Sequence, residues 1–524
     1  MLNNQGRPTQ PEAGHGSAHT KTFTGHRGLQ MEESLIFETG RPDVSGVDID
    51  EPEDFALRLG SLERRTPIDL PGLSEPEAVR HYVRLSQKNY AIDAGLYPLG
   101  SCTMKHNPRL NEKMARLPGL SDIHPLQPQS TVQGAIALMD DLAHWLMEIT
   151  GTHAVAMSPK AGAHGEACGM MAIKAAIEAR GEGATRNVVL VPESAHGTNP
   201  ATAALIGYSV RAVKANADGT VSAAAVREVL GPDVAAIMLT NPNTCGLFER
   251  EIAEIAEAVH AAGAYFYCDG ANLNAIMGKV RSGDLGIDAM HINLHKTFST
   301  PHGGGGPGAG PVVLSAALAP FAPVPFVSKT DEGPLALVEH KAGTQSFGRM
   351  TAFHGQMGMF VRALTYMLSH GGDGLRQASE DAVLSANYIR VCLKDVMSGP
   401  FAERPCMHEA LFDDTWLKGT GVTTLDFTKA MIDEGYHPMT MYFPLVVHGA
   451  MLIEPTESES LASLDLFIMT LRDLAFRVKR GETECFTQAP RLAPRRRLDE
   501  TRAARSPVLR WTPLEPVEAS QAAE

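Results

Sequence analysis

Short apolar segments alternate with helical segments through the middle of the chain, and this alternation limits the folds it can adopt. Strands are predicted at 154–157, 187–192, 235–240, 264–268 and 289–294, with helices at 131–149, 165–180 and 249–262. In the last of these helices Ile252, Ile255 and Val259 recur at helical spacing. Strands separated by such helices form βαβ units, so we predict an α/β fold with a mainly parallel sheet.

Changes in this pattern also suggest where the domains begin and end. We predict a large domain over 96–345 and a smaller α+β domain over 346–490, with a helix at 355–369 and strands at 422–427 and 451–453. The polar segment 1–32 is expected to be a disordered extension, 33–95 an N-terminal arm with a helix at 75–87, and 491–524 a basic tail.

Charge and cysteine content exclude several classes of protein. The formal net charge of -14 argues against general nucleic-acid binding. Seven cysteines without a C-x-x-C pair are typical of a reducing compartment, so we expect a cytoplasmic protein. Residues 297–328 lack Asp, Glu, Lys and Arg, but the prolines and glycines in this stretch are incompatible with a membrane-spanning helix.

Lys296 is the strongest candidate for a catalytic residue. It closes the apolar run 289–294 and is followed by a glycine-dense strap at 303–310. A lysine at the end of a buried strand is partly desolvated, which favours the neutral amine and makes it a nucleophile for an aldehyde cofactor. A solvated lysine beside a flexible loop is the ordinary alternative, and the neighbouring motifs argue against it.

Asp269 follows the preceding predicted strand and is the natural partner of Lys296. A buried carboxylate there could keep the ring nitrogen of pyridoxal phosphate protonated, which makes the ring an electron sink. Gly162 and Ala163 stand where a helix N-terminus would present N–H groups to the cofactor phosphate. His196 could stack on the ring.

Two further polar residues complete the predicted cofactor site. Asn243 lies in a turn after the strand 235–240 and could contact the ring hydroxyl, and His295 adjoins Lys296. Each motif alone is common in proteins. Their order along the chain, from Gly162 to Lys296 at the ends of successive strands, is the order that pyridoxal-phosphate enzymes of the aspartate aminotransferase group (fold type I) require.

The chain also resembles the glycine decarboxylase family, the P-proteins of the glycine cleavage system. It is most similar to their C-terminal half, which many prokaryotes make as a separate subunit 2. The resemblance covers about residues 33 to 511, and it is carried by 100–105, 161–166, 194–200, 239–249, 269–274, 293–311, 442–444, 451–457 and 497–511. The departures are the extension 1–32, the residues 158–160, His106, Leu126 and the segment 491–496.

The resemblance implies an activity, a cofactor and partners. It implies that Lys296 carries pyridoxal 5'-phosphate as an aldimine and that glycine is decarboxylated. In this mechanism Asp269 would keep the ring nitrogen protonated and His196 would stack on the ring. The aminomethyl group would then pass to the lipoyl group of H-protein. It also implies a heterotetramer with the homologous subunit 1, two of each. Candidates for binding the glycine carboxylate are Arg349, Lys105 and His106.

Four alternatives compete with this interpretation. The chain could be another enzyme of the same fold group, such as an aminotransferase, or a silent scaffold subunit, although a silent copy would be free to lose Lys296 and Asp269. Gly303, Gly305 and Gly308 fit a dinucleotide-binding motif, but no helix is predicted after them. His291 and His295 could share a metal ion but lack a third ligand, so we expect no metal.

Overall fold

The computed structural model describes residues 33–41, 44–47, 49–50, 53, 58–66, 70–302, 308–329, 333–493 and 495–512. The predicted extension 1–32, the strap residues 303–307 and the end of the basic tail, 513–524, lie outside the described residues. By its internal packing the chain divides into two compact units. The terminal unit comprises 1–91, 429–436 and 485–524, and the central unit comprises 92–428 and 437–484. The predicted boundary at 345 stays a prediction, since both sides of it belong to the central unit.

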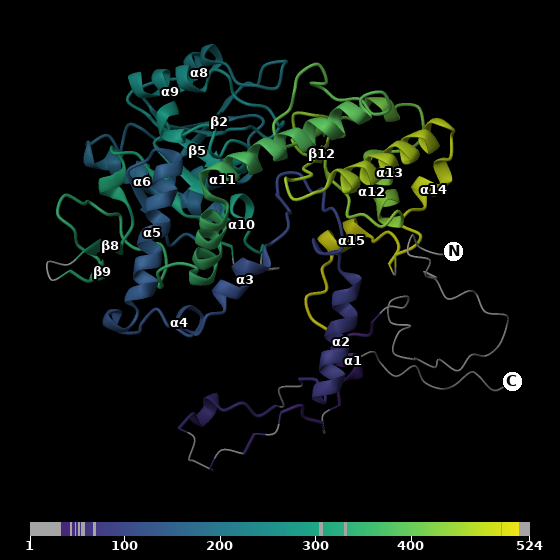
Figure 1. The fold of residues 1–524 in the computed structure, drawn as a ribbon, viewed down its shortest axis with the longest axis horizontal. Helices are drawn as coiled ribbons and strands as arrows, with labels where there is room; N and C mark the ends of the chain where they lie inside the picture. Colours follow the sequence, from purple (N-terminus) through teal and green to yellow (C-terminus); the bar gives the residue numbers. More distant parts are fainter. Residues whose placement is uncertain are drawn as a thin grey trace. The chain divides into compact units, whose positions relative to one another are not determined.

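A seven-stranded sheet forms the centre of the described part of the central unit (Figure 1). Its strands, in spatial order, are β1 (Ala154–Ala156), β7 (Val312–Leu314), β6 (Ala289–Ile292), β5 (Tyr265–Gly270), β4 (Val234–Thr240), β2 (Val188–Pro192) and β3 (Ser209–Val213). Strand β2 pairs in parallel with β3 and β4, and the pairs β4–β5 and β5–β6 are also parallel. Strand β7 is antiparallel to both of its neighbours, β1 and β6. The predicted α/β fold with a mainly parallel sheet is confirmed.

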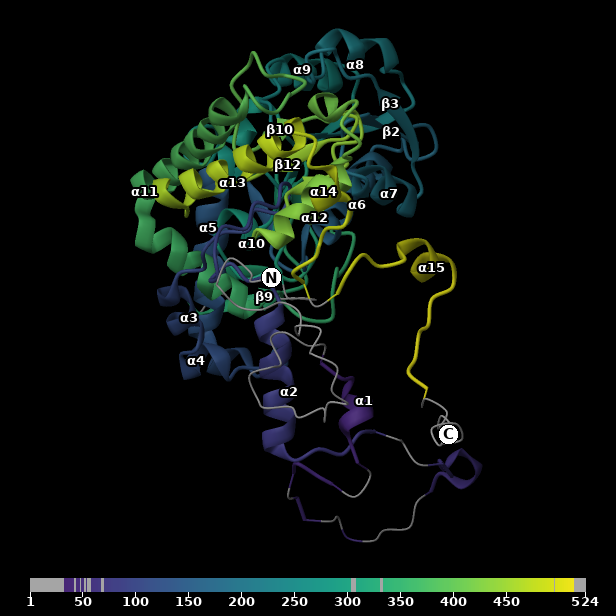
Figure 2. The same ribbon diagram turned by 90° about the vertical axis from the view of Figure 1, so that its right-hand side faces the viewer.

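The sheet is buried on both faces, which explains why its strands are apolar throughout. Successive residues of a strand point to opposite faces, so Leu190 joins one core cluster and Val189 the other. The helices whose residues join the Leu190 cluster are α5 (Gln133–Thr150), α8 (Ala223–Val229), α9 (Ile252–Ala261), α10 (Leu294–Thr297) and α11 (Met357–Leu393), the last with residues from Met359 to Leu375. Those that join the Val189 cluster are α6 (Gly162–Ala179) and α7 (Thr198–Leu205). Figure 2 shows these helices from the side.

The predicted strands and helices of the sheet region are confirmed to within a few residues. Strand β3 was not predicted, because its residues are mostly exposed and it lies at the edge of the sheet, so its sequence lacks a buried strand's apolar run. Strand β6 is shorter than predicted: residues 294–297 form the helical turn α10 (Leu294–Thr297), which contains Lys296. The chain therefore turns away from the sheet just before the candidate lysine.

A second, smaller sheet follows in the chain. It has the order β10 (Ala410–Phe412), β12 (Met451–Ile453) and β11 (Thr440–Met441), and all its described pairs are antiparallel. The predicted strand at 451–453 is confirmed, but the strand predicted at 422–427 is wrong. Residues 424–433 form helix α12 (Thr424–Asp433), in which Asp426 accepts a hydrogen bond from the Thr423 N–H and so caps the first turn.

Helix α11 (Met357–Leu393) is much longer than the predicted helix at 355–369. It is interrupted at Gly371, whose φ of 63° and ψ of 178° are not helical. Its first half packs against the large sheet's core through Met359 and Phe360. Contacts with β10 and with α13 (Leu461–Lys479) connect α11 to the smaller sheet.

The terminal unit contains short helices, of which α2 (Glu75–Lys88) is the longest in its described part. It confirms the helix predicted at 75–87. Ser74 and Glu77 form a capping box at its N-terminus, with the Ser74 N–H donating to Glu77 Oε2 at 2.9 Å. Arg84 donates two hydrogen bonds to the Glu33 carboxylate, from Nε at 2.8 Å and from Nη2 at 2.5 Å. These bonds anchor the start of the described chain to α2.

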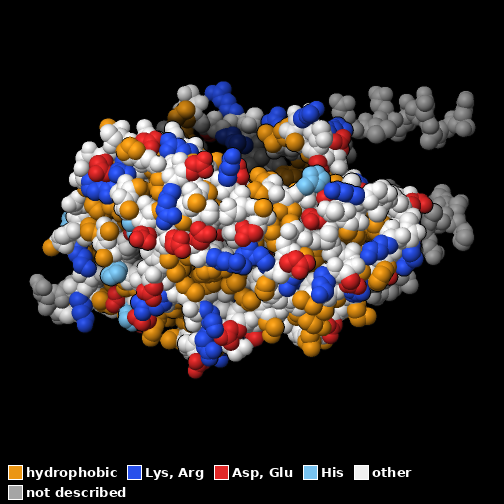
Figure 3. Space-filling view, turned by 90° about the horizontal axis from the view of Figure 1, so that it is seen from above, with side chains coloured by type: hydrophobic (Ala, Val, Ile, Leu, Met, Phe, Trp, Pro, Cys, Tyr) orange, Lys and Arg blue, Asp and Glu red, His pale blue; other side chains and the backbone are white. Residues whose placement is uncertain are grey.

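Residues 297–328, which lack charged side chains, fold into several short elements. They include the end of α10, strand β7 and the start of β8 (Phe326–Lys329). Within the described residues, no helix combines the length and the apolar character needed to cross a bilayer. On the face drawn in Figure 3, acidic and basic side chains are interspersed, and apolar groups lie between them.

Candidate active site

Lys296 lies in α10, just past the carboxyl end of β6, and only 8% of it is exposed. Its Nζ donates to the carbonyl oxygen of Ser101 at 2.6 Å. Ser101 has a φ of 66°, a left-handed conformation that side-chain-bearing residues seldom adopt. The predicted position of the lysine, at a strand end and buried, is therefore confirmed, and a strained loop from another part of the chain orients its amine.

Asp269 lies at the end of β5, the strand that pairs in parallel with β6. Its carboxylate accepts hydrogen bonds from Asn199 Nδ2 at 3.1 Å and from the Ala271 N–H at 3.0 Å, and His291 Nε2 lies 3.4 Å away. Burial acts to raise the pKa of Asp269, but His291 and these donors outweigh it and hold the pKa below its usual value. The arrangement keeps a buried carboxylate ionised.

His196 follows β2, at the turn that begins α7, and its ring is exposed. Its Nδ1 lies 2.9 Å from Thr198 Oγ1, and Thr198 Oγ1 in turn donates to Glu166 Oε1 at 2.6 Å. Burial lowers the pKa of His196 and raises that of Glu166, and the charge of Asp269 raises both. Lys296 also lowers the pKa of His196, so His196 lies within electrostatic reach of the two principal candidates.

Gly162 and Ala163 open helix α6, as the sequence predicted. A side chain at Gly162 would place its Cβ 3.1 Å from Asn293 Oδ1 and 3.2 Å from His291 Nε2. The helix N-terminus therefore lies close against the end of β6, where a side chain would require Asn293 or His291 to move. Gly310, at the far end of the strap, donates its N–H to Pro159 at 3.0 Å, and a Cβ there would lie 2.3 Å from the Ala161 oxygen. The end of the strap therefore lies directly against the backbone that precedes α6.

Several buried polar atoms around Lys296 have no hydrogen-bond partner among the described residues. They belong to Asn293, His295, Thr297, Thr300 and His302. Burial, with the charges of His302 and Lys296, lowers the pKa of His295 to about 3, so its ring is neutral. Unpaired buried polar atoms are costly, so this concentration of them fits a cavity that receives a polar group. With the glycine cradle at 162, these residues suit a phosphorylated, heteroaromatic aldehyde such as pyridoxal phosphate.

The structure gives Asn243 a different role from the predicted contact with a ring hydroxyl. Its Nδ2 donates to Glu249 Oε1 at 2.7 Å and to the Gly219 carbonyl at 2.9 Å. Its Oδ1 accepts from the N–H groups of Cys245 and Leu247. All its hydrogen-bonding groups are occupied by the turn after β4, so the geometry favours a structural role.

The three candidates for binding a substrate carboxylate are also engaged elsewhere. Lys105 is buried, and its Nζ donates to Glu457 Oε1 at 2.6 Å and to the Thr297 oxygen at 3.0 Å. Arg349 pairs with Glu339, and the half-exposed side chain of His106 lies 3.8 Å from Asp93. Each of them therefore has a protein partner in this arrangement.

Two groups of residues in this site were not identified from the sequence. Asn199 and His291 hold Asp269, although only His291 had been considered, as a metal ligand. The second group is a buried cluster of His408, Glu409 and Glu454. Among the described residues this cluster is the one grouping of potential ligands close enough to share a cation, and it contains neither His291 nor His295. The strap residues that resemble a dinucleotide motif lie mostly outside the described chain.

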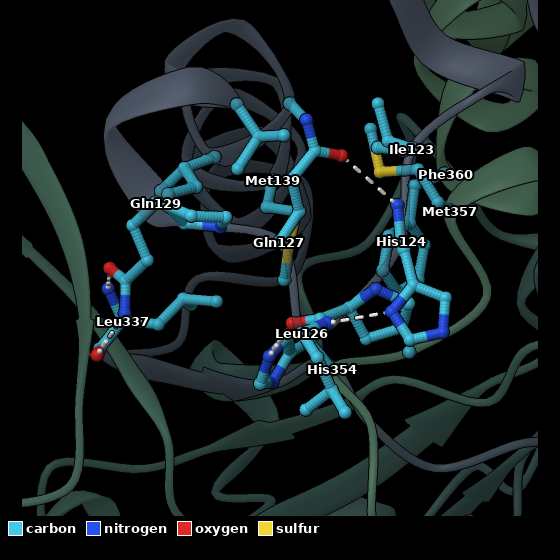
Figure 4. A pocket seen from close by; sticks show the side chains of 16 residues that line it. Ile123, His124, Leu126, Gln127, Gln129, Met139, Leu337, His354, Met357 and Phe360 are labelled. Atoms are coloured by element: carbon cyan, nitrogen blue, oxygen red, sulfur yellow. Dashed lines mark hydrogen bonds between the residues drawn. The ribbon is translucent and has the colours of Figure 1, made fainter.

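An apolar cavity of about 440 Å³ lies apart from these residues (Figure 4). The loop 123–129, the start of α5 and residues 354–360 line it, with Leu126, Met139 and Phe360 among its side chains. His354 Nε2 lies 3.1 Å from the Pro125 oxygen and holds two of its walls together. Although apolar pockets are common ligand sites, this one contains no member of the Lys296 constellation.

The sheet order, the buried lysine after β6 and the buried aspartate on β5 define a pyridoxal-phosphate-dependent enzyme fold of type I. A family model described as aminotransferase class-V matches residues 164–306, and one described as glycine dehydrogenase, C-terminal domain, matches residues 378–493. The chain belongs to the family of glycine dehydrogenase (decarboxylating) subunit 2.

Comparison with individual proteins places the chain in that family. It is 68% identical over 519 residues to a probable glycine dehydrogenase (decarboxylating) subunit 2 of Caulobacter vibrioides, covering 98% of each chain. A protein of the same description from Oceanobacillus iheyensis is 51% identical over 91% of this chain and 99% of its own.

A solved structure of glycine decarboxylase (P-protein) in inhibitor-bound form has a similar fold. It matches with a TM-score of 0.65 at 23% identity, over 78% of this chain and 92% of that one. A cysteine desulfurase from Thermococcus onnurineus matches with a TM-score of 0.57 at 12% identity, over 73% and 95% of the two chains. At these identities the two matches support the fold alone.

Proposed function

We propose that this chain is the cofactor-carrying subunit of a two-subunit glycine decarboxylase. It releases the carboxyl group of glycine as carbon dioxide and passes the aminomethyl group to the lipoyl group of an H-protein. The observation that carries the proposal is the placement of Lys296 and Asp269 at the ends of two adjacent parallel strands. Family membership over nearly the whole length of the chain supports the choice of glycine.

The residues that would hold pyridoxal phosphate are those grouped around Lys296. Lys296 would bond covalently to the aldehyde, Asp269 would face the ring nitrogen, and His196 would lie against the ring. Gly162 and Ala163 would offer their N–H groups to the phosphate, and His295 would supply a neutral polar wall. When bound, the cofactor supplies an electron sink for the pair of electrons left behind by departing carbon dioxide.

Each of these side chains has a task that its surroundings explain. Asp269 would accept a hydrogen bond from a protonated ring nitrogen, because Asn199, Ala271 and His291 keep its carboxylate ionised. Ser101 fixes the Lys296 amine by accepting its hydrogen bond. Thr198 links His196 to Glu166, which limits rotation of the imidazole.

The proposal includes partners. Relatives of this chain are described as subunit 2, which supports assembly with a homologous subunit 1, in a tetramer with two of each. The lipoylated H-protein would be the acceptor. All seven cysteines are free thiols, which supports a location in the reducing cytoplasm.

The first experiment is the exchange of labelled bicarbonate into the carboxyl group of glycine. Lipoylated H-protein is supplied, and the chain is assayed with and without subunit 1. Exchange that requires both subunits is the expected result. Exchange by this chain alone would remove the obligatory partner, and no exchange despite bound pyridoxal phosphate would point to another amino acid or to transamination.

Substitution of Lys296 by alanine tests the covalent attachment. We expect Lys296→Ala to abolish exchange and the absorbance of the bound cofactor while the circular dichroism spectrum stays unchanged. Lys279→Ala is the matched control, because Lys279 is half-exposed and pairs with Glu380 on the surface. Retained exchange in Lys296→Ala would show that the lysine has been wrongly assigned.

Substitution of Asp269 by asparagine tests the contact with the ring nitrogen. Asparagine keeps the size of the side chain but cannot stabilise a protonated ring nitrogen with a negative charge. We expect exchange to fall on the order of 100-fold, with the cofactor still bound. A wild-type rate would exclude the proposed role of Asp269.

A further inference from the structure

Two glutamates and a histidine are buried together beside the candidate cofactor lysine. His408, Glu409 and Glu454 are fully buried, and their potential ligand atoms lie within 4.8 Å of one another. Glu409 directly precedes β10 and Glu454 directly follows β12. These strands are antiparallel, with Ala410 opposite Ile453, so the pairing itself brings the two carboxyl groups together.

A strained segment links these carboxyl groups to Lys296. The Ser101 N–H donates to Glu409 Oε1 at 2.5 Å, and the Ser101 oxygen accepts from Lys296 Nζ at 2.6 Å. Thr103 donates to Glu454 through its N–H, at 3.0 Å, and through its hydroxyl, at 2.5 Å. Ser101 and Thr103 both have positive φ, 66° and 37°. Strained backbone of this kind persists only when surrounding contacts hold it, and here the two glutamates do so.

The two carboxyl groups lack a charged partner that could balance two negative charges. In the described part of the chain, the ion-pair contacts that reach them come from His408, at 3.7 Å from Glu409 and 3.9 Å from Glu454. Burial and the charge of Lys296 lower the pKa of His408 to about 3, so the imidazole is neutral. Two ionised carboxylates in one buried site are strongly disfavoured, and one of them retains its proton.

The hydrogen bonding of Glu409 also indicates that one of the two carboxyl groups is protonated. Glu409 Oε2 is buried and has no donor among the described residues. A carboxylate can only accept, so two facing carboxylates leave such an atom unsatisfied, whereas one proton between them satisfies it. Burial raises the pKa of both residues, and the charge of Glu454 raises that of Glu409 further.

We propose that Glu409 and Glu454 share one proton and serve as positioning residues for Lys296, to which they present a single negative charge through the Ser101 segment. This inference rests on the proposed function in that it takes Lys296 as the cofactor lysine. The pair and the Lys296 ammonium together are neutral, so the lysine can be charged in a buried site.

Other titratable groups also surround the pair and belong to the same electrostatic system. Besides Lys296 and His408 they are His302, Cys102, Cys245 and Cys406. Burial raises the pKa of each thiol and lowers that of His302, so all four are neutral near pH 7. These four groups therefore add no charge beside the pair, and the ionised Asp269 is a second negative charge that Lys296 senses.

Infrared spectroscopy of the full-length chain tests the shared proton directly. A protonated carboxyl group has a carbonyl band separate from those of carboxylates, and labelling with carbon-13 glutamate identifies it without any substitution. We expect wild-type protein to keep such a band at pH 8.5, and Glu409→Gln or Glu454→Gln to lose it, because the remaining carboxyl group then ionises. Glu249→Gln is the control and should keep the band at pH 8.5. Burial raises the pKa of Glu249 to about 7, so Glu249 is itself ionised at pH 8.5 and contributes no carbonyl band there.

A second measurement tests the coupling to Lys296. The cofactor-free chain is mixed with pyridoxal phosphate at a series of pH values, and the covalent adduct is trapped with borohydride and counted by mass spectrometry. Each single Gln variant keeps one negative charge, so its pH midpoint should stay near that of wild type. The double variant loses the charge, so its midpoint should fall by about one pH unit or more.

The outcomes separate the possible failures. Absence of the band from wild type, or its persistence in both single variants, would overturn the shared proton. An unchanged pH midpoint in the double variant would overturn the positioning role. So would the finding that the purified wild-type chain holds one metal ion per molecule and that the His408→Ala variant does not. If wild type formed no adduct at Lys296, the proposed function would fail while the infrared result stood by itself.

Discussion

The buried ion pair of Lys105 and Glu457 gives a quantitative test of how the Lys296 turn is supported. Lys105 is 4% exposed, and only 12% of the Glu457 side chain is exposed. Burial acts to lower the pKa of Lys105, but the charge of Glu457 outweighs it and holds the pKa above its usual value. The same Nζ donates to the carbonyl oxygen of Thr297, which directly follows Lys296. Loss of Lys105 therefore leaves a buried carboxylate without its charged partner, with the Tyr366 hydroxyl at 3.2 Å as a neutral donor, and a carbonyl without its donor.

We expect Lys105→Met to lower the free energy of unfolding by about 3–5 kcal/mol, the usual cost of leaving one partner of a buried pair uncompensated. The double variant Lys105→Met/Glu457→Gln should recover most of this loss, because no unpaired charge remains. The pair's contribution is complete at neutral pH and is lost as pH rises through the raised pKa of Lys105, above the usual value of about 10.4.

Equilibrium urea unfolding, followed by circular dichroism, measures this loss. Lys174→Met is the control, because Lys174 is partly buried and donates to the Ile206 oxygen without a carboxylate partner. A change below about 1 kcal/mol in Lys105→Met would refute the reasoning, since surface substitutions routinely produce changes of that size. So would a double variant no more stable than the single one.

Two further predictions concern the strap and a buried carboxyl group. Gly310→Ala would place a Cβ 2.3 Å from the Ala161 oxygen, so we expect lost cofactor binding and a lower melting temperature, whereas Gly372→Ala, with open space around it, should change neither. Because burial raises the pKa of Glu249 to about 7, the unfolded chain releases this proton first, and stability should fall by roughly 3 kcal/mol between pH 4.5 and 7. Glu249→Gln should remove that slope in urea titrations at different pH values; an identical slope in the variant would contradict the assignment.

The sequence was sufficient to predict the sheet and the two principal site residues. Buried parallel strands are continuously apolar, so β2, β4 and β5 were evident from composition alone. The carboxyl ends of parallel strands meet at one edge, and this placed Asp269 and Lys296 together before any coordinates. Strand β3 has an edge strand's exposed pattern, and α12 is preceded and opened by the β-branched residues Val422, Thr423 and Thr424, which local propensity assigns to a strand.

The support of the site could not be predicted in the same way. Glu409 and Glu454 meet through an antiparallel strand pairing. Ser101 accepts a hydrogen bond from Lys296, which lies 195 residues later in the sequence. Asn243 presents a different case. Its position after β4 suggested a cleft residue, but its amide satisfies the backbone of its own turn, which is a common use of asparagine.

The break in α11 has a geometric consequence. At Gly371 the backbone adopts φ 63° and ψ 178°, a combination that essentially only glycine tolerates, and the helical hydrogen-bond ladder is interrupted there. The break does not separate the two halves, because Leu375, beyond it, packs in the same core as Met359 and Phe360. It redirects the helix instead, so that the second half still follows the sheet core and also reaches α13, where the Tyr388 hydroxyl donates to Asp465 at 2.6 Å.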